Sequence, residues 1–178
     1  VVITTRYWRA MAFQQDNLES QRLYHWATYM YEQGYILVTV DARGSGASFG
    51  SRDAEIDHNE VKDSGEVLNW VAQRPWCDGR VATTGISYSA ATALYSLVTA
   101  PPTLKVAVCR APDFDLYRHL FAPGGIINYW FISAWGASTA AQDKNDMHAL
   151  LEAGYWVPPE NGANHVLGVR PVDISHSA

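Results

Sequence analysis

The fold is decided by the stretch Val81-Ala82-Thr83-Thr84-Gly85-Ile86-Ser87-Tyr88-Ser89-Ala90. Residues 80–84 are mostly small, apolar or β-branched, as in a strand that is buried in a parallel sheet. An alanine-rich run that favours a helix follows over 88–99 and ends before Pro101. Between the two lies Gly-x-Ser-x-small, a pattern whose small side chains allow a sharp strand-to-helix turn. We therefore predict a strand, a strained turn at Ser87 and a helix that begins directly after it.

Strands and helices alternate through the first two thirds of the chain. The predicted strands cover 1–5, 36–40, 80–84 and 105–109, and the predicted helices cover 18–32, 60–73 and 88–99. Near-continuously apolar strands that alternate with helices are typical of a parallel sheet covered on both faces. The expected fold class is α/β, with a mostly parallel, doubly wound sheet. Ligands of such sheets bind beyond the carboxyl ends of the strands.

The composition is that of a globular domain. The 178 residues are 48% apolar and 17% charged, which is enough for one sizeable core. A formal charge of -5 gives no basic surface for nucleic acid, so we expect no nucleic-acid partner. No apolar run of roughly 18 to 20 residues and no signal pattern occurs, so we expect no membrane insertion. The chain starts at Val1 within a strand-like run, so a targeting segment could precede it and the cellular location stays open. The cytoplasm is slightly favoured.

Two cysteines, Cys77 and Cys109, are too few for a disulfide scaffold and lack the paired spacing of a zinc site. We interpret both as buried thiols. The sequence indicates neither a metal nor an organic cofactor.

The character of the sequence changes after Ala111. We therefore divide the chain into a partial α/β core over 1–111 and a helical cap-like region over 112–178, with no clear strand and no closing element in the latter. Aromatic residues are crowded there: Tyr117, Phe121, Tyr129, Trp130, Phe131, Trp135, Tyr155 and Trp156. Packing against one another is favoured for them over a role as a substrate-facing wall.

Ser87 is the candidate nucleophile. A strained turn between a strand and a helix would expose its Oγ at the edge of the sheet. The same turn would aim the backbone N–H of Tyr88 at an oxyanion that forms on the substrate. Gly-x-Ser-x-Ser is common by chance, and Ser89 replaces the usual glycine. The flanking strand and helix nevertheless favour the catalytic interpretation.

Four motifs, taken in order, resemble the cocaine esterase and X-prolyl dipeptidyl-peptidase family (S15-like, CocE/NonD) of α/β-hydrolases, over roughly residues 1 to 135. They are Arg6-Tyr7-Trp8-Arg9, Asp41-Ala42-Arg43-Gly44-Ser45-Gly46-Ala47-Ser48, Pro75-Trp76-Cys77-Asp78-Gly79-Arg80-Val81 and Gly85-Ile86-Ser87-Tyr88. The resemblance implies an α/β-hydrolase fold, here incomplete, followed by the start of a helical cap. It also implies that Ser87 is the nucleophile and that the Tyr88 N–H and the Tyr7 hydroxyl are oxyanion donors. Each such donor is typically worth about 3 kcal/mol.

Without the resemblance, packing against Trp8 would be the favoured role of Tyr7. Asp41 and Arg43 are interpreted as pinning a turn around glycines rather than as catalytic groups. Glu60 and Asp63 are interpreted as favouring a helix start through its dipole.

The rest of a catalytic triad is not found. This fold presents its serine, acid and histidine in that order along the chain, and no position here matches the family's acid or histidine. Stand-ins would be Asp113 or Asp115 with His119, His148, His165 or His176, each of which is better explained as a surface or packing residue.

The expected activity is acyl transfer through a Ser87 acyl-enzyme, on a small-molecule ester, amide or peptide substrate. An X-Pro dipeptidyl-peptidase is a close alternative. A non-catalytic binding module that retains a partial hydrolase fold, and is stable and monodisperse, is a second one. The 178 residues by themselves are expected to be inactive, and a homo-oligomer is possible.

Overall fold

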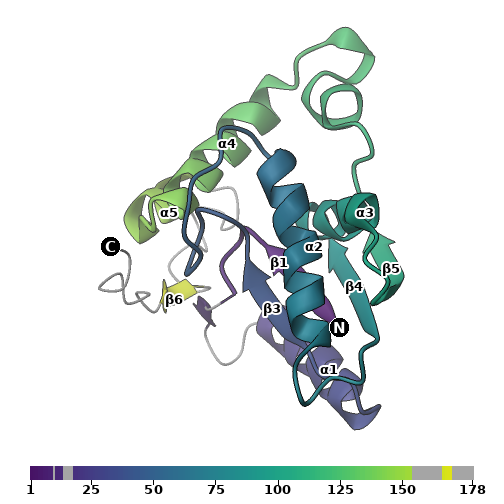
Figure 1. The fold of residues 1–178 in the computed structure, drawn as a ribbon. Coiled ribbons are helices and arrows are strands. Elements are labelled where there is room, and N and C mark those ends of the chain that lie inside the picture. Colours follow the sequence, from purple (N-terminus) through teal and green to yellow (C-terminus); the bar gives the residue numbers. More distant parts are fainter. Residues whose placement is uncertain (10, 14–17, 154–165, 170–178) are drawn as a thin grey trace.

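A four-stranded parallel sheet carries the first part of the chain (Figure 1). The computed structural model describes residues 1–9, 11–13, 18–153 and 166–169. The strands are β1 (Val2–Thr5), β3 (Val38–Asp41), β4 (Val81–Ile86) and β5 (Leu104–Arg110), in the order β3-β1-β4-β5. This order confirms the predicted α/β class and the partial, parallel sheet. Within the described residues, no helix is long and apolar enough to cross a membrane.

The register of the sheet aligns the carboxyl ends of the strands. β1 pairs with β3 from Val2↔Val38 to Thr5↔Asp41. β4 pairs with β5 as far as Ile86↔Arg110. The loops that follow β1, β3 and β4 therefore begin at the same edge, which is where parallel sheets bind ligands.

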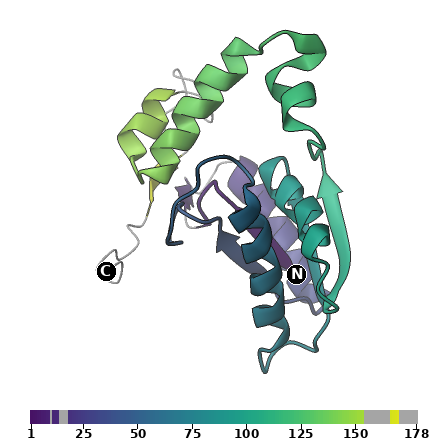
Figure 2. The same ribbon diagram turned by 45° about the horizontal axis from the view of Figure 1, so that its top comes forward.

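Helices cover both faces of the sheet. Figures 1 and 2 show α1 (Leu18–Glu32) on the face opposite α2 (His58–Ala72) and α3 (Tyr88–Thr99). Leu68 and Val71 of α2 form a buried cluster with Val2 and Val81. Burial of apolar side chains from helix and sheet is the main stabilising contribution of such a layer.

The segment after β5 arches back over the carboxyl end of the sheet (Figure 2). It contains a π-helical turn η1 (Tyr117–Phe121), a 3-10 turn η2 (Pro123–Gly125) and the helices α4 (Tyr129–Asp143) and α5 (Met147–Ala153). Trp8, only 3% exposed, packs against Ala141 and Leu150 and donates its Nε1–H to the Gln142 carbonyl oxygen at 3.1 Å. The loop after β1 therefore seats α4 and α5 on the core.

The aromatic residues of this segment divide into two groups. Phe121, Phe131 and Trp135 pack against one another, with ring centroids 5.5 to 6.2 Å apart. Tyr129 and Trp130 are exposed. The packing interpretation is confirmed for the first group, Tyr117 is also exposed, and Tyr155 and Trp156 lie outside the described residues.

A second, two-stranded sheet corrects the sequence analysis. β2 (Met11–Phe13) pairs antiparallel with β6 (Val166–Val169), although a loop was expected after β1 and no strand after residue 111. Strands of three and four residues show no measurable alternation, and this pair joins distant parts of the chain. The local pattern therefore could not reveal it.

Candidate active site

Ser87 lies on a strained turn between β4 and α3. Its φ of 56° and ψ of −125° fall in a region that L-residues seldom adopt. The turn is held by hydrogen bonds of its own backbone: the Ser87 N–H donates to the Arg110 carbonyl oxygen at 3.2 Å, and its carbonyl oxygen accepts from Ala90 and Ala91. The Ser87 side chain is exposed at the carboxyl edge of the sheet. This is the turn that the sequence predicts.

Gly85 explains why the turn needs small residues. A Cβ placed on Gly85 would lie 2.3 Å from the backbone carbonyl carbon and oxygen of Ser89. Such a contact is far inside van der Waals range and involves backbone rather than a flexible side chain. Only glycine fits at that position.

Tyr88 begins α3 and is buried, with 6% of its surface exposed. Its hydroxyl donates to Oε1 of Glu60. Burial, and then the neighbouring Glu60 carboxylate, raises the pKa of Tyr88, so the phenol stays neutral and remains a donor. The backbone N–H of Tyr88 is among the first N–H groups of the helix, which have no acceptor within the helix itself.

Tyr7 lies next to Tyr88. The two rings meet edge to face with centroids 5.9 Å apart, and the Tyr7 hydroxyl accepts from Nε1 of Trp135 at 3.4 Å. Tyr7, Ser87 and Tyr88 line one small cavity of about 30 Å³, together with Asp113 and Trp135. The structure thus brings together the three site residues singled out from the sequence.

The stand-ins for a triad are less well placed. Asp113 lines the cavity with Ser87, but Asp115 accepts a hydrogen bond from the Arg118 N–H of η1 at 2.9 Å and is not among the residues that line this cavity. His119 and His148 are exposed and are not among the residues that line this cavity. His165 and His176 lie outside the described residues.

Comparison with known proteins identifies the family. The family model for X-Pro dipeptidyl-peptidase (S15 family) matches residues 1–158. The chain belongs to the S15 peptidase family. It is 39% identical over 139 residues to the Mycobacterium bovis protein named "Putative serine esterase Mb1866c", covering 78% of this chain and 21% of that protein. It is 31% identical over 114 residues to the cocaine esterase of Rhodococcus, covering 64% of this chain and 19% of that enzyme.

A crystal structure of a CocE/NonD family hydrolase from Staphylococcus aureus is similar in fold and sequence. Its TM-score is 0.56 at 29% identity, over 68% of this chain and 23% of that one. This similarity and the parallel sheet confirm an incomplete α/β-hydrolase fold. The S15 chain spans about a fifth of the length of the curated relatives that it matches.

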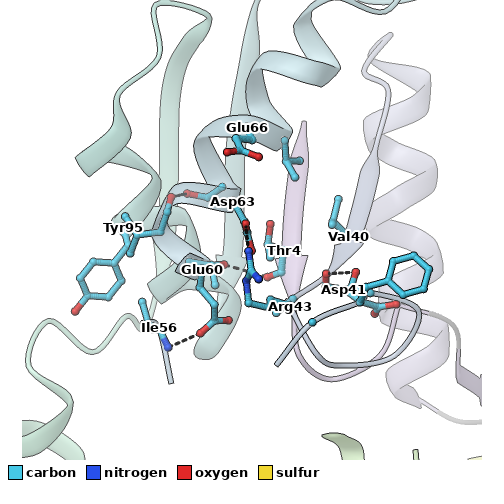
Figure 3. Close-up of a pocket in the computed structure, with 17 residues that line it drawn as sticks. Thr4, Val40, Asp41, Arg43, Ile56, Glu60, Asp63, Glu66 and Tyr95 are labelled. Carbon is cyan, nitrogen blue, oxygen red and sulfur yellow. Dashed lines mark hydrogen bonds and ion pairs between the residues drawn. The ribbon is translucent and has the colours of Figure 1, made fainter. Parts of the chain in front are cut away.

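A larger cavity of the S15 chain, of about 410 Å³, lies between α2, α3 and the loop after β3 (Figure 3). Ser87 is not among the residues that line it. Asp41 pins that loop, as expected, by accepting from the N–H groups of Arg9 and Ala47. Arg43 instead forms two hydrogen bonds with Asp63 of α2, so Asp63 is an ion-pair partner and not only a helix-start residue.

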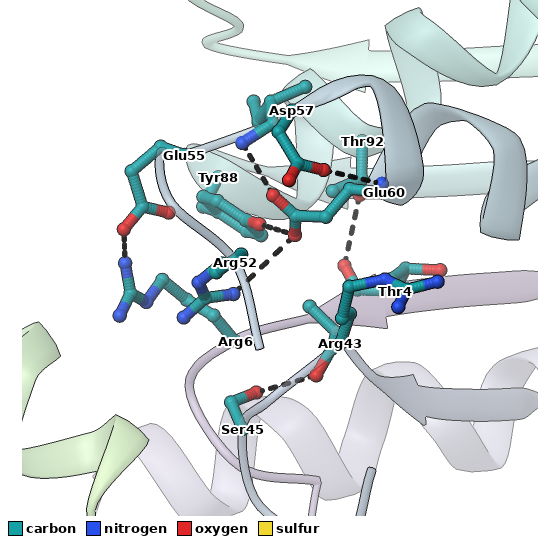
Figure 4. A network of polar contacts seen from close by, with 12 residues as sticks. Thr4, Arg6, Arg43, Ser45, Arg52, Glu55, Asp57, Glu60, Tyr88 and Thr92 are labelled. Atoms are coloured by element: carbon teal, nitrogen blue, oxygen red, sulfur yellow. Dashed lines mark hydrogen bonds and ion pairs between the residues drawn. The ribbon is translucent and has the colours of Figure 1, made fainter. Parts of the chain in front are cut away.

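A network of charged residues lies beside the Ser87 cavity (Figure 4). Arg6, which is fully buried, pairs with Glu55 and with Asp143 of α4. Arg52, only 4% exposed at its side chain, pairs with Glu60 and with the same Asp143. Neither arginine was predicted from the sequence to be a site residue. The one available signal was the position of Arg6 directly after a buried strand, at the edge where parallel sheets bind ligands.

The guanidinium of Arg6 also lies over two aromatic rings. Its Cζ is 5.9 Å from the Tyr88 ring centroid and 5.3 Å from that of Trp135. Burial lowers the pKa of Arg6, and the Asp143 carboxylate partly offsets that effect. The network therefore connects α4, the loop after β1 and the first turn of α3.

Proposed function

We propose that the protein carrying this chain is a serine hydrolase that cleaves carboxylic esters by acyl transfer to Ser87. The observation that carries the proposal is the backbone of Ser87, at φ 56° and ψ −125°, with its side chain exposed at the carboxyl end of β4. A strained, exposed serine between a strand and a helix is the arrangement of a nucleophile elbow. Residues held in such sparsely populated backbone regions cluster at active sites.

The proposed reaction has two halves. Ser87 Oγ attacks the ester carbonyl carbon and gives its proton to a general base, and the alcohol then leaves with a proton. Water next attacks the acyl-enzyme, which releases the carboxylic acid and restores the serine. The general base is not assigned to any described residue.

Two groups are proposed to stabilise the oxyanion of each half. The backbone N–H of Tyr88 lies at the start of α3, where the helix dipole favours negative charge. The Tyr7 hydroxyl lines the same cavity and, as a phenol, can donate to an oxyanion while it accepts from Trp135.

An ester is preferred as substrate because two of the relatives are named esterases. The name of the matching family supports a second candidate, the removal of X-Pro dipeptides. Hydrolysis of p-nitrophenyl acyl esters, compared with that of Xaa-Pro p-nitroanilides, separates the two.

A fluorophosphonate probe tests the nucleophile in the full-length protein. We expect one covalent adduct that mass spectrometry maps to Ser87, and loss of both adduct and hydrolysis in Ser87→Ala. Ser133→Ala is the matched control, because Ser133 is an exposed serine of α4. Labelling of the Ser87→Ala variant at the wild-type level would refute the proposal.

A further inference from the structure

Glu60 is a buried carboxylate whose oxygens face groups outside its own helix. It is 8% exposed and lies in the first turn of α2. Oε1 accepts from the Tyr88 hydroxyl and lies 3.4 Å from Nη1 of Arg52, and Oε2 accepts from the N–H of Ile56. Figure 4 shows the Tyr88 hydroxyl and Arg52 reaching the Glu60 carboxylate.

A helix-start role accounts only for Oε2, which reaches back to the Ile56 N–H as in a capping box, and leaves the contacts of Oε1 with the Tyr88 hydroxyl and Arg52 unexplained. The cap of α2 is provided by Asp57, whose Oδ1 accepts from the Glu60 N–H at 2.8 Å. A carboxylate that serves the helix dipole alone can stay in water, where its charge is solvated. Burial of the Glu60 side chain costs free energy that only its donors offset.

The Tyr88 ring joins this carboxylate to the Ser87 cavity. The ring contacts the guanidinium of Arg6 and meets the ring of Tyr7 edge to face, and its hydroxyl end is held by Glu60. A buried side chain whose far end is hydrogen-bonded has few other rotamers open to it. Because Tyr88 is the first residue of α3, fixing its side chain also fixes the backbone N–H beside Ser87.

We propose that Glu60 is a positioning residue for catalysis, which holds the Tyr88 backbone N–H in place for the oxyanion through the Tyr88 hydroxyl. This inference rests on the proposed serine hydrolase function. Arg52 is required in the same arrangement, because an unpaired negative charge at Glu60 would oppose a second negative charge on the substrate.

The test compares four variants of the full-length protein: Tyr88→Phe, Glu60→Ala, Glu60→Gln and the double variant Tyr88→Phe/Glu60→Ala. Active sites are counted with the fluorophosphonate probe, so that kcat refers to labelled Ser87 only. We expect Tyr88→Phe and Glu60→Ala each to lower kcat on the order of 10-fold or more with little change in KM, because donors to an oxyanion act in the transition state. Glu60→Gln keeps an acceptor for the Tyr88 hydroxyl and should lose less.

The double variant gives the sharpest result. If Glu60 acts through Tyr88, the kcat of the double variant is no lower than that of the worse single variant. Glu66→Gln is the matched control, since Glu66 is an exposed acid of the same helix whose partner is Lys62, and its kcat should equal that of wild type.

Three outcomes overturn the inference. One is an unchanged kcat per labelled site in Glu60→Ala, another is additive losses in the double variant, and the third is an equal loss in Glu66→Gln. If Glu60→Ala does not fold, Tyr88→Phe decides, since it keeps the buried ring and removes only the hydroxyl that Glu60 holds; an unchanged kcat per labelled site in Tyr88→Phe then overturns the inference. A wild-type protein that is neither labelled nor active refutes the proposed function itself, whereas an active one with unaffected Glu60 variants refutes only the role of Glu60.

Discussion

The backbone of Ser87 is strained, because its φ and ψ lie in a region that residues with a Cβ seldom adopt. Non-glycine residues in such sparsely populated regions cost on the order of 1–3 kcal/mol. Glycine adopts them freely but gains about 0.5–1 kcal/mol of entropy in the unfolded chain. We therefore predict that Ser87→Gly is more stable than Ser87→Ala by about 1 kcal/mol. Urea unfolding of the two inactive variants measures the difference, and equal midpoints would show that the turn is not strained.

Glycine is required at position 85 because there is no space for a Cβ, and not because of its dihedral angles. Its missing Cβ would overlap the backbone of Ser89, so we predict that Gly85→Ala loses about 3 kcal/mol or more of stability. Gly136 of α4 is the matched control, because nothing lies within 4 Å of its Cβ position. Gly136→Ala should gain about 0.5–1 kcal/mol, as alanine does inside a helix. Thermal or urea unfolding of both variants tests the contrast.

Among individual residues, the sequence predicted the turn at Ser87 better than it predicted the side chains that surround that turn in space. The small residues around Ser87 are needed for local reasons, so the motif alone indicated the strand, the turn and the helix. The proximity of Tyr7 followed from a family resemblance. The role of Glu60 could not be predicted, because its burial depends on Arg52 and Tyr88, which come from other segments. Their convergence is a property of the tertiary structure.

Helix α4 is attached to the core at its carboxyl end by charge as well as by apolar contact. Oδ1 of Asp143 pairs with Arg6 and with Arg52, both nearly inaccessible to water. Removal of one partner from a buried ion pair costs about 3–5 kcal/mol, but the Asp143 side chain is 35% exposed, which reduces this effect. We predict that Asp143→Ala destabilises the protein by about 1–2 kcal/mol and loosens α4.

Hydrogen exchange followed by mass spectrometry checks this prediction. Peptides from 129–143 should exchange faster in Asp143→Ala, whereas those from 81–86 should be unchanged. Glu152→Ala is the control, because Glu152 lies on α5, is 71% exposed at its side chain and pairs only locally with His148. Equal exchange of α4 in both variants would contradict the role of Asp143.

The elements were predicted with unequal success for physical reasons. Helices over 18–32 and 88–99 were predicted at their observed bounds, since an apolar stripe ends clearly at a glycine or before a proline. Helix α2 begins two residues earlier than predicted because Asp57 is its cap. The strand expected at 36–40 lies at Val38–Asp41, where pairing with β1 sets the limits. Tertiary pairing, which also forms β2 and β6, is not visible in a local window.

For the molecule as a whole, β5 is an edge of the four-stranded sheet and has an uncovered face. Val106 and Val108 are about half exposed, at 49% and 51%, and alternate along the strand. Exposed apolar edge strands promote association. We predict that the 178-residue chain self-associates with concentration, and that Val106→Lys/Val108→Lys reduces this association.

Sedimentation velocity at several concentrations measures the effect. Val98→Lys is the control, because Val98 is 72% exposed and lies on helix α3 rather than on the edge strand. A monodisperse 178-residue chain would instead favour the interpretation as a binding module.

Arg6 and Asp143 are far apart in the sequence, so they are synthesised at different times. The two residues are 137 positions apart, so a ribosome that adds ~5–20 residues per second makes Arg6 roughly 7 to 27 s before its partner. β1 immediately precedes this interval, and β3, β4 and β5 are all synthesised within it. The sheet can therefore pair its strands before Asp143 exists, and the buried Arg6 side chain gains this partner only once α4 has been made.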